Sequence, residues 1–492
     1  MNDKVQLGFM ATGVPGLDSL LGGGLSEFSF NIIAGAPGSG KTTLAHQIMF
    51  ALASAQKKAL FFTVLGEPPL KMLRYQQQYD FFDIDMVDSC IRYVNLAEDL
   101  RTGDFNGVLQ RIIKEVEAFS PGLVFVDSFR SVIQMAKNGN EGVADLQYFI
   151  QELGTRMTSW QATTFLIGEY VDPDGEANPI MTVADGLISL SQHIARNSVV
   201  RKIRIVKMRG QAHQMGLHTF RISGNGLHVY PRMLPEPGLA RAADGGGVLE
   251  IERVPIGVPD LDLLLHGGLP KGHAVMVVGP SGSGKTILGT AFLAQGVAMG
   301  ERGVIACFEK GPSRLRNAAL DRLVREGQVS MFQNRSLDLS VEEILDDLVS
   351  AVRGTGATRV VIDSLSEAGL YLAPEFRQDF REAIFRILAG LAETGATVMV
   401  TMGLEDRFTD LRFSQADSSF LADAIIAMRY VEIEGRLSKV ISVIKVRGSS
   451  HDTDLRRYDI TDRGLQIDAT VMRFDGMLSG RPVASGGRGE GH

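Results

Sequence analysis

Cysteine is scarce in this chain, and the usual signals for export or membrane insertion are lacking. The 492 residues include two cysteines, Cys90 and Cys307, which is too few for a disulfide framework and favours core positions for both. No apolar run reaches the roughly 18 residues that a membrane span needs. Met1–Val5 lacks the basic and then apolar pattern of a secretory signal. These absences predict a soluble, cytoplasmic protein.

Basic charge and metal-ligand spacings are lacking as well. No arrangement of cysteine and histidine has the spacing of a zinc site, and the formal net charge of −7 gives no overall attraction to nucleic acid. A nucleic-acid motor would need basic loops with interleaved aromatic residues. The candidate loops, Asp172–Thr182 and Glu405–Ser418, carry little basic charge, with Arg407 and Arg412 in the second. Nucleic acid is therefore an unfavoured partner, and a recombinase-like or helicase-like motor is an alternative.

What the chain does contain, twice, is a glycine-rich motif of the form G-x-x-x-x-G-K-[ST]. Each copy follows a short apolar run, Phe28–Ala34 or Ala274–Val278, and precedes a helical pattern, Thr43–Ala55 or Ile287–Met299. A strand, a loop and a helix in this order are the setting of a phosphate-binding loop. The candidate nucleotide-binding residues are Gly35, Gly38, Ser39, Gly40, Lys41, Thr42 and Thr43 in the first copy and Gly279, Gly282, Ser283, Gly284, Lys285 and Thr286 in the second.

These residue types fit the chemistry of nucleotide phosphates. Glycines let backbone N–H groups approach phosphate oxygens with no Cβ in the way, and the start of the following helix adds positive potential. Lys41 and Lys285 are expected to reach the β- and γ-phosphates and to act in catalysis. Thr42 and Thr286 are expected to hold Mg²⁺. ATP and Mg²⁺ are therefore the expected cofactors.

The two motifs belong to an internal repeat. Thr12–Asp18 returns as Ile256–Asp262, at the same separation as the two motif lysines. Between the copies, Pro231–Gly247 holds three prolines and a run of glycines with no periodic apolar pattern. The sequence therefore predicts a first domain at 1–232, a linker at 233–247, a second domain at 248–475 and a tail at 476–492.

Apolar, β-rich runs alternate with helical patterns within each repeat. In the first repeat the expected strands are Ala59–Val64, Leu123–Asp127, Thr163–Ile167 and Lys202–Lys207, and helices are expected at Asn106–Phe119 and Ala144–Thr158. This alternation predicts an α/β fold in each half, with a mainly parallel sheet flanked by helices. Lys207–Tyr230 and Lys445–Ile467 are expected to add antiparallel strands at the sheet edge. Ligands then bind at the carboxyl ends of the parallel strands.

Two aspartates end apolar strands at equivalent places. Asp127 and Asp363 each end an apolar strand and precede a serine. A carboxylate at such a strand end, beside a phosphate loop, is the Walker B arrangement that holds the shell of Mg²⁺. The alternative is an aspartate that only caps a loop, and the phosphate loop in each half disfavours it. The predicted metal ligands are Thr42 with Asp127 and Thr286 with Asp363.

Two basic pairs also recur. Lys207 and Arg209 in the first half correspond to Lys445 and Arg447 in the second. Their alternating positions put both side chains of a pair on one face of a strand. Such groups can stabilise phosphate charge on a neighbouring subunit, in the manner of an arginine finger. A solvated sheet edge is the alternative, and the recurrence favours a catalytic role within a ring oligomer.

From Thr12 to about Pro482, the chain resembles the double-domain KaiC proteins of the RecA/DnaB-like ATPase superfamily. The most specific segments are Asp423–Gly435, Val443–His451, Tyr458–Gly464 and Phe474–Pro482. The resemblance implies two tandem RecA-like P-loop NTPase domains and a homohexamer of stacked rings, with ATP bound between subunits. It also implies a protein partner of the KaiB type or another signalling protein.

In RecA-like ATPases a glutamate after the strand beside the phosphate-loop strand orients the attacking water. Glu309 matches this place in the second half, whereas Leu65 holds it in the first half. We therefore expect unequal sites, with hydrolysis in the second half through Glu309. The first half is expected to bind ATP and hydrolyse it slowly, unless Glu67 or Glu169 substitutes.

The resemblance further implies autophosphorylation in the second half. The family modifies a serine and a threonine just before the aspartate that matches Asp423, and here those places hold Ser419 and Phe420. Ser419 is therefore the candidate phosphorylation site, with Ser418 as an adjacent candidate that the family pattern does not predict. This reading makes the chain a timing or signalling module with kinase activity. The alternative is a nucleotide-gated assembly scaffold with slight turnover.

Overall fold

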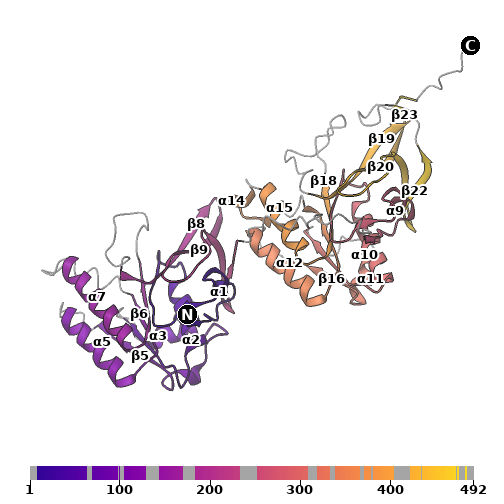
Figure 1. The fold of residues 1–492 in the computed structure, drawn as a ribbon. Coiled ribbons are helices and arrows are strands. Elements are labelled where there is room, and N and C mark those ends of the chain that lie inside the picture. The colour runs from indigo at the N-terminus through magenta and orange to yellow at the C-terminus, as the bar shows by residue number, and fades with distance from the viewer. Residues whose placement is uncertain are drawn as a thin grey trace, which may run out of the picture. The chain divides into compact units, whose positions relative to one another are not determined.

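The computed structural model describes residues 8–63, 69–97, 99, 105–128, 143–169, 183–232, 252–308, 318–332, 338–365, 369, 371–377, 380–403, 422–433, 435–471, 474–475 and 483–484. The chain divides into two compact units, Met1–Arg232 and Met233–His492. Within the described residues, each unit contains one nine-stranded sheet with helices packed on it (Figure 1). None of the described helices is both long enough and apolar enough to cross a membrane.

The elements of the first unit follow the predicted alternation. Its strands are β1 (Phe9–Met10), β2 (Leu25–Ser26), β3 (Phe30–Gly35), β4 (Ala59–Thr63), β5 (Ile91–Asn95), β6 (Leu123–Asp127), β7 (Thr163–Gly168), β8 (Gly186–Ala195), β9 (Ser198–Met208), β10 (His218–Ser223) and β11 (Gly226–Tyr230). Its helices are α1 (Leu17–Leu20), α2 (Lys41–Leu52), α3 (Pro69–Gln76), α5 (Phe105–Phe119), α7 (Val143–Ser159) and the short 3-10 helix η1 (Ile84–Met86).

The second unit repeats this order and adds a short hairpin. Its strands are β12 (Arg253–Val254), β13 (Leu269–Pro270), β14 (Ala274–Gly279), β15 (Gly303–Cys307), β16 (Val329–Phe332), β17 (Arg359–Asp363), β18 (Thr397–Gly403), β19 (Ala424–Ile433), β20 (Arg436–Val446), β21 (Arg456–Thr461), β22 (Gly464–Val471), β23 (Phe474–Asp475) and β24 (Val483–Ala484). Its helices are α9 (Pro259–Leu264), α10 (Lys285–Ala298), α11 (Ala318–Arg325), α12 (Val341–Thr355), α14 (Pro374–Arg377) and α15 (Phe380–Ala392).

The strand order places each phosphate-loop strand inside its sheet. In the first unit β5, β4, β6, β7, β3 and β8 are parallel neighbours, and β9, β10 and β11 continue the sheet in antiparallel fashion. In the second unit the parallel order is β16, β15, β17, β18, β14 and β19, followed by antiparallel β20, β21 and β22. Both the α/β prediction and the antiparallel edge are confirmed. The expectation that the strand before Glu309 lies beside the phosphate-loop strand is wrong, because β17 and β18 separate β15 from β14.

A core lies on each face of each sheet, because successive strand side chains point to opposite faces. In β3, Ile32 packs in the cluster that includes Leu109 of α5, whereas Ile33 packs in the cluster that includes Leu44 of α2. All four side chains are buried. The phosphate-loop strand is therefore held between two helical layers, which fixes where the loop begins.

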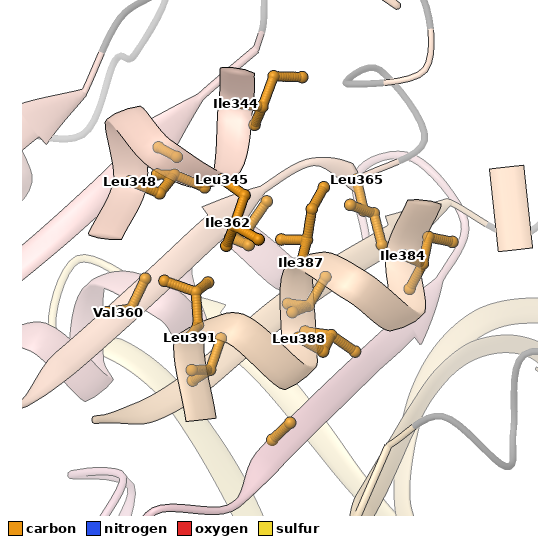
Figure 2. Packing of buried hydrophobic residues seen from close by; sticks show 14 of the residues in the cluster. Ile344, Leu345, Leu348, Val360, Ile362, Leu365, Ile384, Ile387, Leu388 and Leu391 are labelled. Carbon is orange, nitrogen blue, oxygen red and sulfur yellow. The ribbon is translucent and has the colours of Figure 1, made fainter. Parts of the chain in front are cut away.

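Figure 2 shows the corresponding packing in the second unit, where α12 and α15 face β17. Along α15, Ile384, Ile387, Leu388 and Leu391 recur at helical spacing and are buried against the sheet. Ser340 caps the start of α12: its side chain accepts from the backbone N–H of Glu343, and the side chain of Glu343 accepts from the backbone N–H of Ser340. This capping box satisfies the first N–H groups of the helix.

Candidate nucleotide sites

Each phosphate loop joins the centre of its sheet to a long helix. In the first unit β3 ends at Gly35 and α2 begins at Lys41, and in the second β14 ends at Gly279 and α10 begins at Lys285. These four residues therefore occupy equivalent places, at the carboxyl edge of the parallel strands where the sequence predicted them. Ser39 and Ser283, at equivalent places within the loops, are also fully buried.

Glycine is required immediately before each motif lysine. Gly40 and Gly284 have φ values of 104° and 100°, a conformation that residues with a Cβ rarely adopt. An ideal Cβ on Gly40 would lie 2.7 Å from Cδ1 of Ile222, and one on Gly284 would lie 2.8 Å from Cδ1 of Ile460. The two loops therefore share one backbone shape and one type of apolar support behind it.

The helices that follow the loops begin without side-chain caps. Neither α2 nor α10 has a capping hydrogen bond at its first turn, and neither has an acidic residue there. The capping box of α12 shows that this chain caps a helix elsewhere. The first N–H groups of α2 and α10 therefore remain suited to an anion at the loop, and this donor set fits nucleotide phosphates.

The two motif lysines lie inside their loops. Lys41 donates from Nζ to the carbonyl oxygen of Ala36 at 2.8 Å. Lys285 donates to the carbonyl oxygens of Gly279 and Pro280, both at 2.8 Å. Each ammonium group is thus held next to the uncapped helix start, where it adds positive charge to the same anion site.

Asp127 is hydrogen-bonded to the residue that follows the motif lysine of its own unit. It is 9% exposed, and its Oδ2 accepts a hydrogen bond from Oγ1 of Thr42 at 2.7 Å. Burial raises the pKa of Asp127, while the bond from Thr42 and the charge of Lys41 act in the opposite sense. A carboxylate and a hydroxyl in contact beside a phosphate loop are the hard oxygen ligands that Mg²⁺ prefers. The first predicted pair of metal ligands is therefore adjacent.

Asp363 has a different partner. It is 8% exposed, and its Oδ1 accepts a hydrogen bond from Oγ1 of Thr401 on β18. The strand pairing of β7 with β3 puts Ile167 at the corresponding place in the first unit. In both units the peptide bond after the aspartate is cis. The carboxylates occupy equivalent strand ends, but the side chains that orient them differ.

The recurring arginines are each anchored by an aspartate in the same way. Nη1 of Arg209 lies 3.3 Å from Oδ1 of Asp185, and Nη1 of Arg447 lies 3.6 Å from Oδ1 of Asp423. Both arginines are about half exposed. In each case the other carboxylate oxygen accepts from the first backbone N–H of the phosphate-loop strand, at 3.0 Å. The two guanidinium groups are therefore fixed to the start of β3 and of β14.

The lysines of these pairs share that edge of the sheet. Burial and then the charge of the adjacent arginine lower the pKa of both Lys207 and Lys445, against the opposite effect of the aspartate. Strand register sets Lys207 level with the start of β8, which is parallel to β3. Lys207 is thus level with Ile32, and Gly35 lies three residues further along β3, or about 10 Å at the rise of a strand. Neither basic pair therefore faces the phosphate loop of its own unit.

Three residues that contact the loops were missed from the sequence. Gln192 on β8 donates from Nε2 to the carbonyl oxygen of Gly38 at 2.7 Å. Tyr430 on β19 and Tyr458 on β21 donate to carbonyl oxygens of the second loop. Gln192 precedes Lys207 by 15 residues, and Tyr430 precedes Lys445 by 15 residues. This correspondence between the two repeats is the signal in the sequence that could have indicated these two residues.

Several predicted residues lie outside the described part of the chain. They are Glu309, Ser418, Ser419, Leu65, Glu67 and the candidate channel loops 172–182 and 405–418. Glu169 is described and follows directly after β7, at the edge where the phosphate loop begins. Among the described residues no group of three or more His, Cys, Asp or Glu side chains could hold a metal ion. A Mg²⁺ ion at either phosphate loop would therefore be held by one carboxylate and one hydroxyl, as Asp127 and Thr42 provide.

The fold and the two loops define a P-loop ATPase built from two tandem RecA-like domains. The chain belongs to the KaiC ATPase family, whose profile, described as "ATPase: KaiC", matches residues 10–233 and 254–471. The predicted resemblance is thereby confirmed, and the two matched stretches coincide with the two sheets.

Similar proteins cover nearly the whole chain at low identity. The circadian clock oscillator protein KaiC of Thermostichus vulcanus is 26% identical over 96% of this chain and 91% of its own length. The protein of the same name from Prochlorococcus marinus is 25% identical over 98% of this chain and 97% of its own. The circadian clock protein KaiC3 of Synechocystis is 26% identical over 96% and 94%.

Proposed function

We propose that the chain binds Mg-ATP in both halves, hydrolyses it in a homohexameric ring and transfers phosphate to its own Ser419. The main support is the pair of phosphate loops. Each loop precedes a helix that has no side-chain cap, and each lies beside a buried aspartate at the end of a strand. Bound Mg²⁺ would neutralise phosphate charge. Thr42 and Asp127 would hold it in the first half, and Thr286 and Asp363 in the second.

Assembly into a ring is supported by the place of the basic pairs. Lys207 and Arg209, like Lys445 and Arg447, lie at the sheet edge away from their own loop. A neighbouring copy can bring its nucleotide to that edge, where the two cations would stabilise phosphate charge. This role requires each site to be completed by a second copy.

The proposal also assigns different rates of ATP hydrolysis to the two halves. Glu309 is assigned as the residue that orients the attacking water in the second half, and Leu65 stands at that place in the first. Relatives are named circadian clock oscillator proteins. We therefore assign this chain to a timing or signalling module that docks a protein partner of the KaiB type, with ATP turnover concentrated in the second half.

Nucleotide stoichiometry tests binding in each half. The intact chain is expected to bind two nucleotides, and Lys41→Ala or Lys285→Ala is expected to leave one, measured by equilibrium dialysis with labelled ATP and Mg²⁺. Turnover is expected to fall far more with Lys285→Ala than with Lys41→Ala. Fast turnover that depends on Lys41 would contradict the assignment of hydrolysis to the second half.

Mixing variants tests the ring. In a Lys41→Ala background, chains with Lys285→Ala and chains with Arg447→Ala are each expected to be inactive. Rings mixed from both contain some sites with Lys285 from one chain and Arg447 from the next, so turnover should reappear. If mixing restores nothing while the same chains co-assemble, Arg447 acts within its own chain and the proposal fails.

Phosphopeptide mass spectrometry after incubation with Mg-ATP tests the kinase activity. Phosphate is expected on Ser419 and is expected to disappear in both Ser419→Ala and Glu309→Gln. Ser418→Ala is the matched control and should keep the phosphate on Ser419. ATP turnover with no phosphate on any peptide would make the chain an ATPase without the kinase step.

A further inference from the structure

Two tyrosines, Tyr430 on β19 and Tyr458 on β21, contact the second phosphate loop. Tyr458 donates from Oη to the carbonyl oxygen of Ser283 at 2.6 Å, and the residue is 1% exposed. Tyr430 donates to the carbonyl oxygen of Ser281 at a longer 3.5 Å. Burial, and then the nearby Tyr430, raises the pKa of Tyr458. The buried hydroxyl therefore keeps its proton and remains a donor to the loop.

The first half has a phenylalanine at the equivalent place. Phe220 on β10 is two strands away from Gln192, as Tyr458 on β21 is two strands away from Tyr430. Phe220 also approaches its loop, because its Cε2 would lie 3.7 Å from a Cβ on Gly40. A phenylalanine ring has no hydroxyl. An aromatic ring therefore packs near both loops, but only Tyr458 can donate a hydrogen bond to its loop.

The bond from Tyr458 fixes a peptide group that glycine leaves free to turn. The carbonyl of Ser283 and the N–H of Gly284 belong to one peptide plane and point in opposite directions. Gly284 has a φ of 100° and no Cβ to restrict it. Holding the carbonyl toward β21 therefore aims the N–H of Gly284 away from β21.

We propose that Tyr458 is a positioning residue that presets the second phosphate loop for nucleotide phosphates. The inference rests on the proposed binding of ATP by that loop. Tyr458 acts through the Ser283–Gly284 peptide, with no contact to the nucleotide itself. Its effect is therefore confined to ligands that carry phosphate, because adenosine does not bond to the N–H groups of the loop.

The substitution Tyr458→Phe tests this role, since it removes one hydroxyl and copies Phe220. In a Lys41→Ala background, which isolates the second site, affinities for ATP, ADP and adenosine are measured by calorimetry. Loss of one orienting hydrogen bond is expected to weaken ATP and ADP about three- to tenfold and to leave adenosine unchanged. In a Lys285→Ala background, the same substitution should not change binding at the first site.

Three results would overturn the proposal, and they have different meanings. If unfolding without nucleotide becomes easier while all three affinities stay the same, the hydroxyl of Tyr458 only stabilises the fold. Equal weakening of adenosine and ATP would mean a general distortion of the site. If the Lys41→Ala chain with Tyr458 intact binds no nucleotide, the proposed function of the second half fails, and the role of Tyr458 fails with it.

Discussion

One buried histidine makes the first half sensitive to acid. His46 on α2 is fully buried, with Nδ1 2.7 Å from the carbonyl oxygen of Thr42. Its ring lies against Phe61 and Tyr93, with centroid distances of 4.5 Å and 6.1 Å. Burial lowers the pKa of His46 from 6.5 to about 4, although the bond to the Thr42 backbone acts in the opposite sense.

The sign and size of the effect follow from this difference in pKa. Below about pH 6.5 the unfolded chain takes up a proton at this histidine, whereas the folded chain does so only near pH 4. Folding stability from His46 is therefore complete above pH 6.5 and is lost as the pH falls toward 4. Linkage gives a loss of about 2 kcal/mol at pH 5 and about 3 kcal/mol below pH 4.

The test compares His46→Thr with the unsubstituted chain. The change copies Thr290, whose Oγ1 donates to the carbonyl oxygen of Thr286 at 2.8 Å, a contact of the same kind in the second half. Trp160 is the single tryptophan of the chain, so its fluorescence in urea reports unfolding of the first half. The lost side-chain volume costs about 2–4 kcal/mol at every pH and cancels in a comparison between two pH values.

Between pH 7.5 and pH 5, the unsubstituted chain is expected to lose about 2 kcal/mol more unfolding free energy than His46→Thr. His46→Gln, which is closer to histidine in volume, should behave like His46→Thr. Other groups, including Asp127 with its raised pKa, titrate in all three proteins and do not alter the difference. Equal losses in all three proteins would refute the assignment of the acid sensitivity to His46.

Three further outcomes are expected. Arg359→Leu should lower the unfolding free energy of the second half by about 3 kcal/mol, measured by circular dichroism in urea, because the buried guanidinium is removed with its ion pair to the partly exposed Glu301 and its bonds to the carbonyl oxygens of Pro255 and Phe292. Ser340→Ala should cost about 1 kcal/mol in the same assay through loss of the capping box. Thr401→Val, in a Lys41→Ala background, should raise the Mg²⁺ concentration needed for ATP binding several-fold by releasing Asp363, as seen in a Mg²⁺ titration.

The phosphate loops and the strands could be predicted because their signals are local. A run such as Leu123–Val126 is apolar at every position, and both faces of β6 are indeed buried. The spacing of Gly35, Gly40 and Lys41 defines a loop that the first turn of α2 then completes. Such patterns need no knowledge of distant parts of the chain, so the α/β fold and the place of both loops were accessible from the sequence.

The partners of the loops could not be predicted, because they depend on how distant strands pair. Tyr458 contacts Ser283 across 175 positions of sequence, and the successive pairing of β14, β19, β20 and β21 brings the two together. Thr401 reaches Asp363 in the same way, from a neighbouring strand. Nothing in the sequence indicates that the side chains of Tyr458 and Thr401 reach a phosphate loop or a strand-end aspartate, because those contacts exist only in the assembled sheet.

The two aspartates show why a duplicated backbone can carry unlike sites. Asp127 is bonded to Thr42, which belongs to the phosphate loop and its helix, so a movement of the loop acts directly on this carboxylate. Asp363 is bonded to Thr401, which belongs to the sheet, so its orientation is set by a part of the fold that the loop does not move. The same strand end is therefore coupled to the loop in the first half and to the sheet in the second. A reorientation of the strand-end carboxylate on nucleotide release is accordingly expected for Asp127 and not for Asp363.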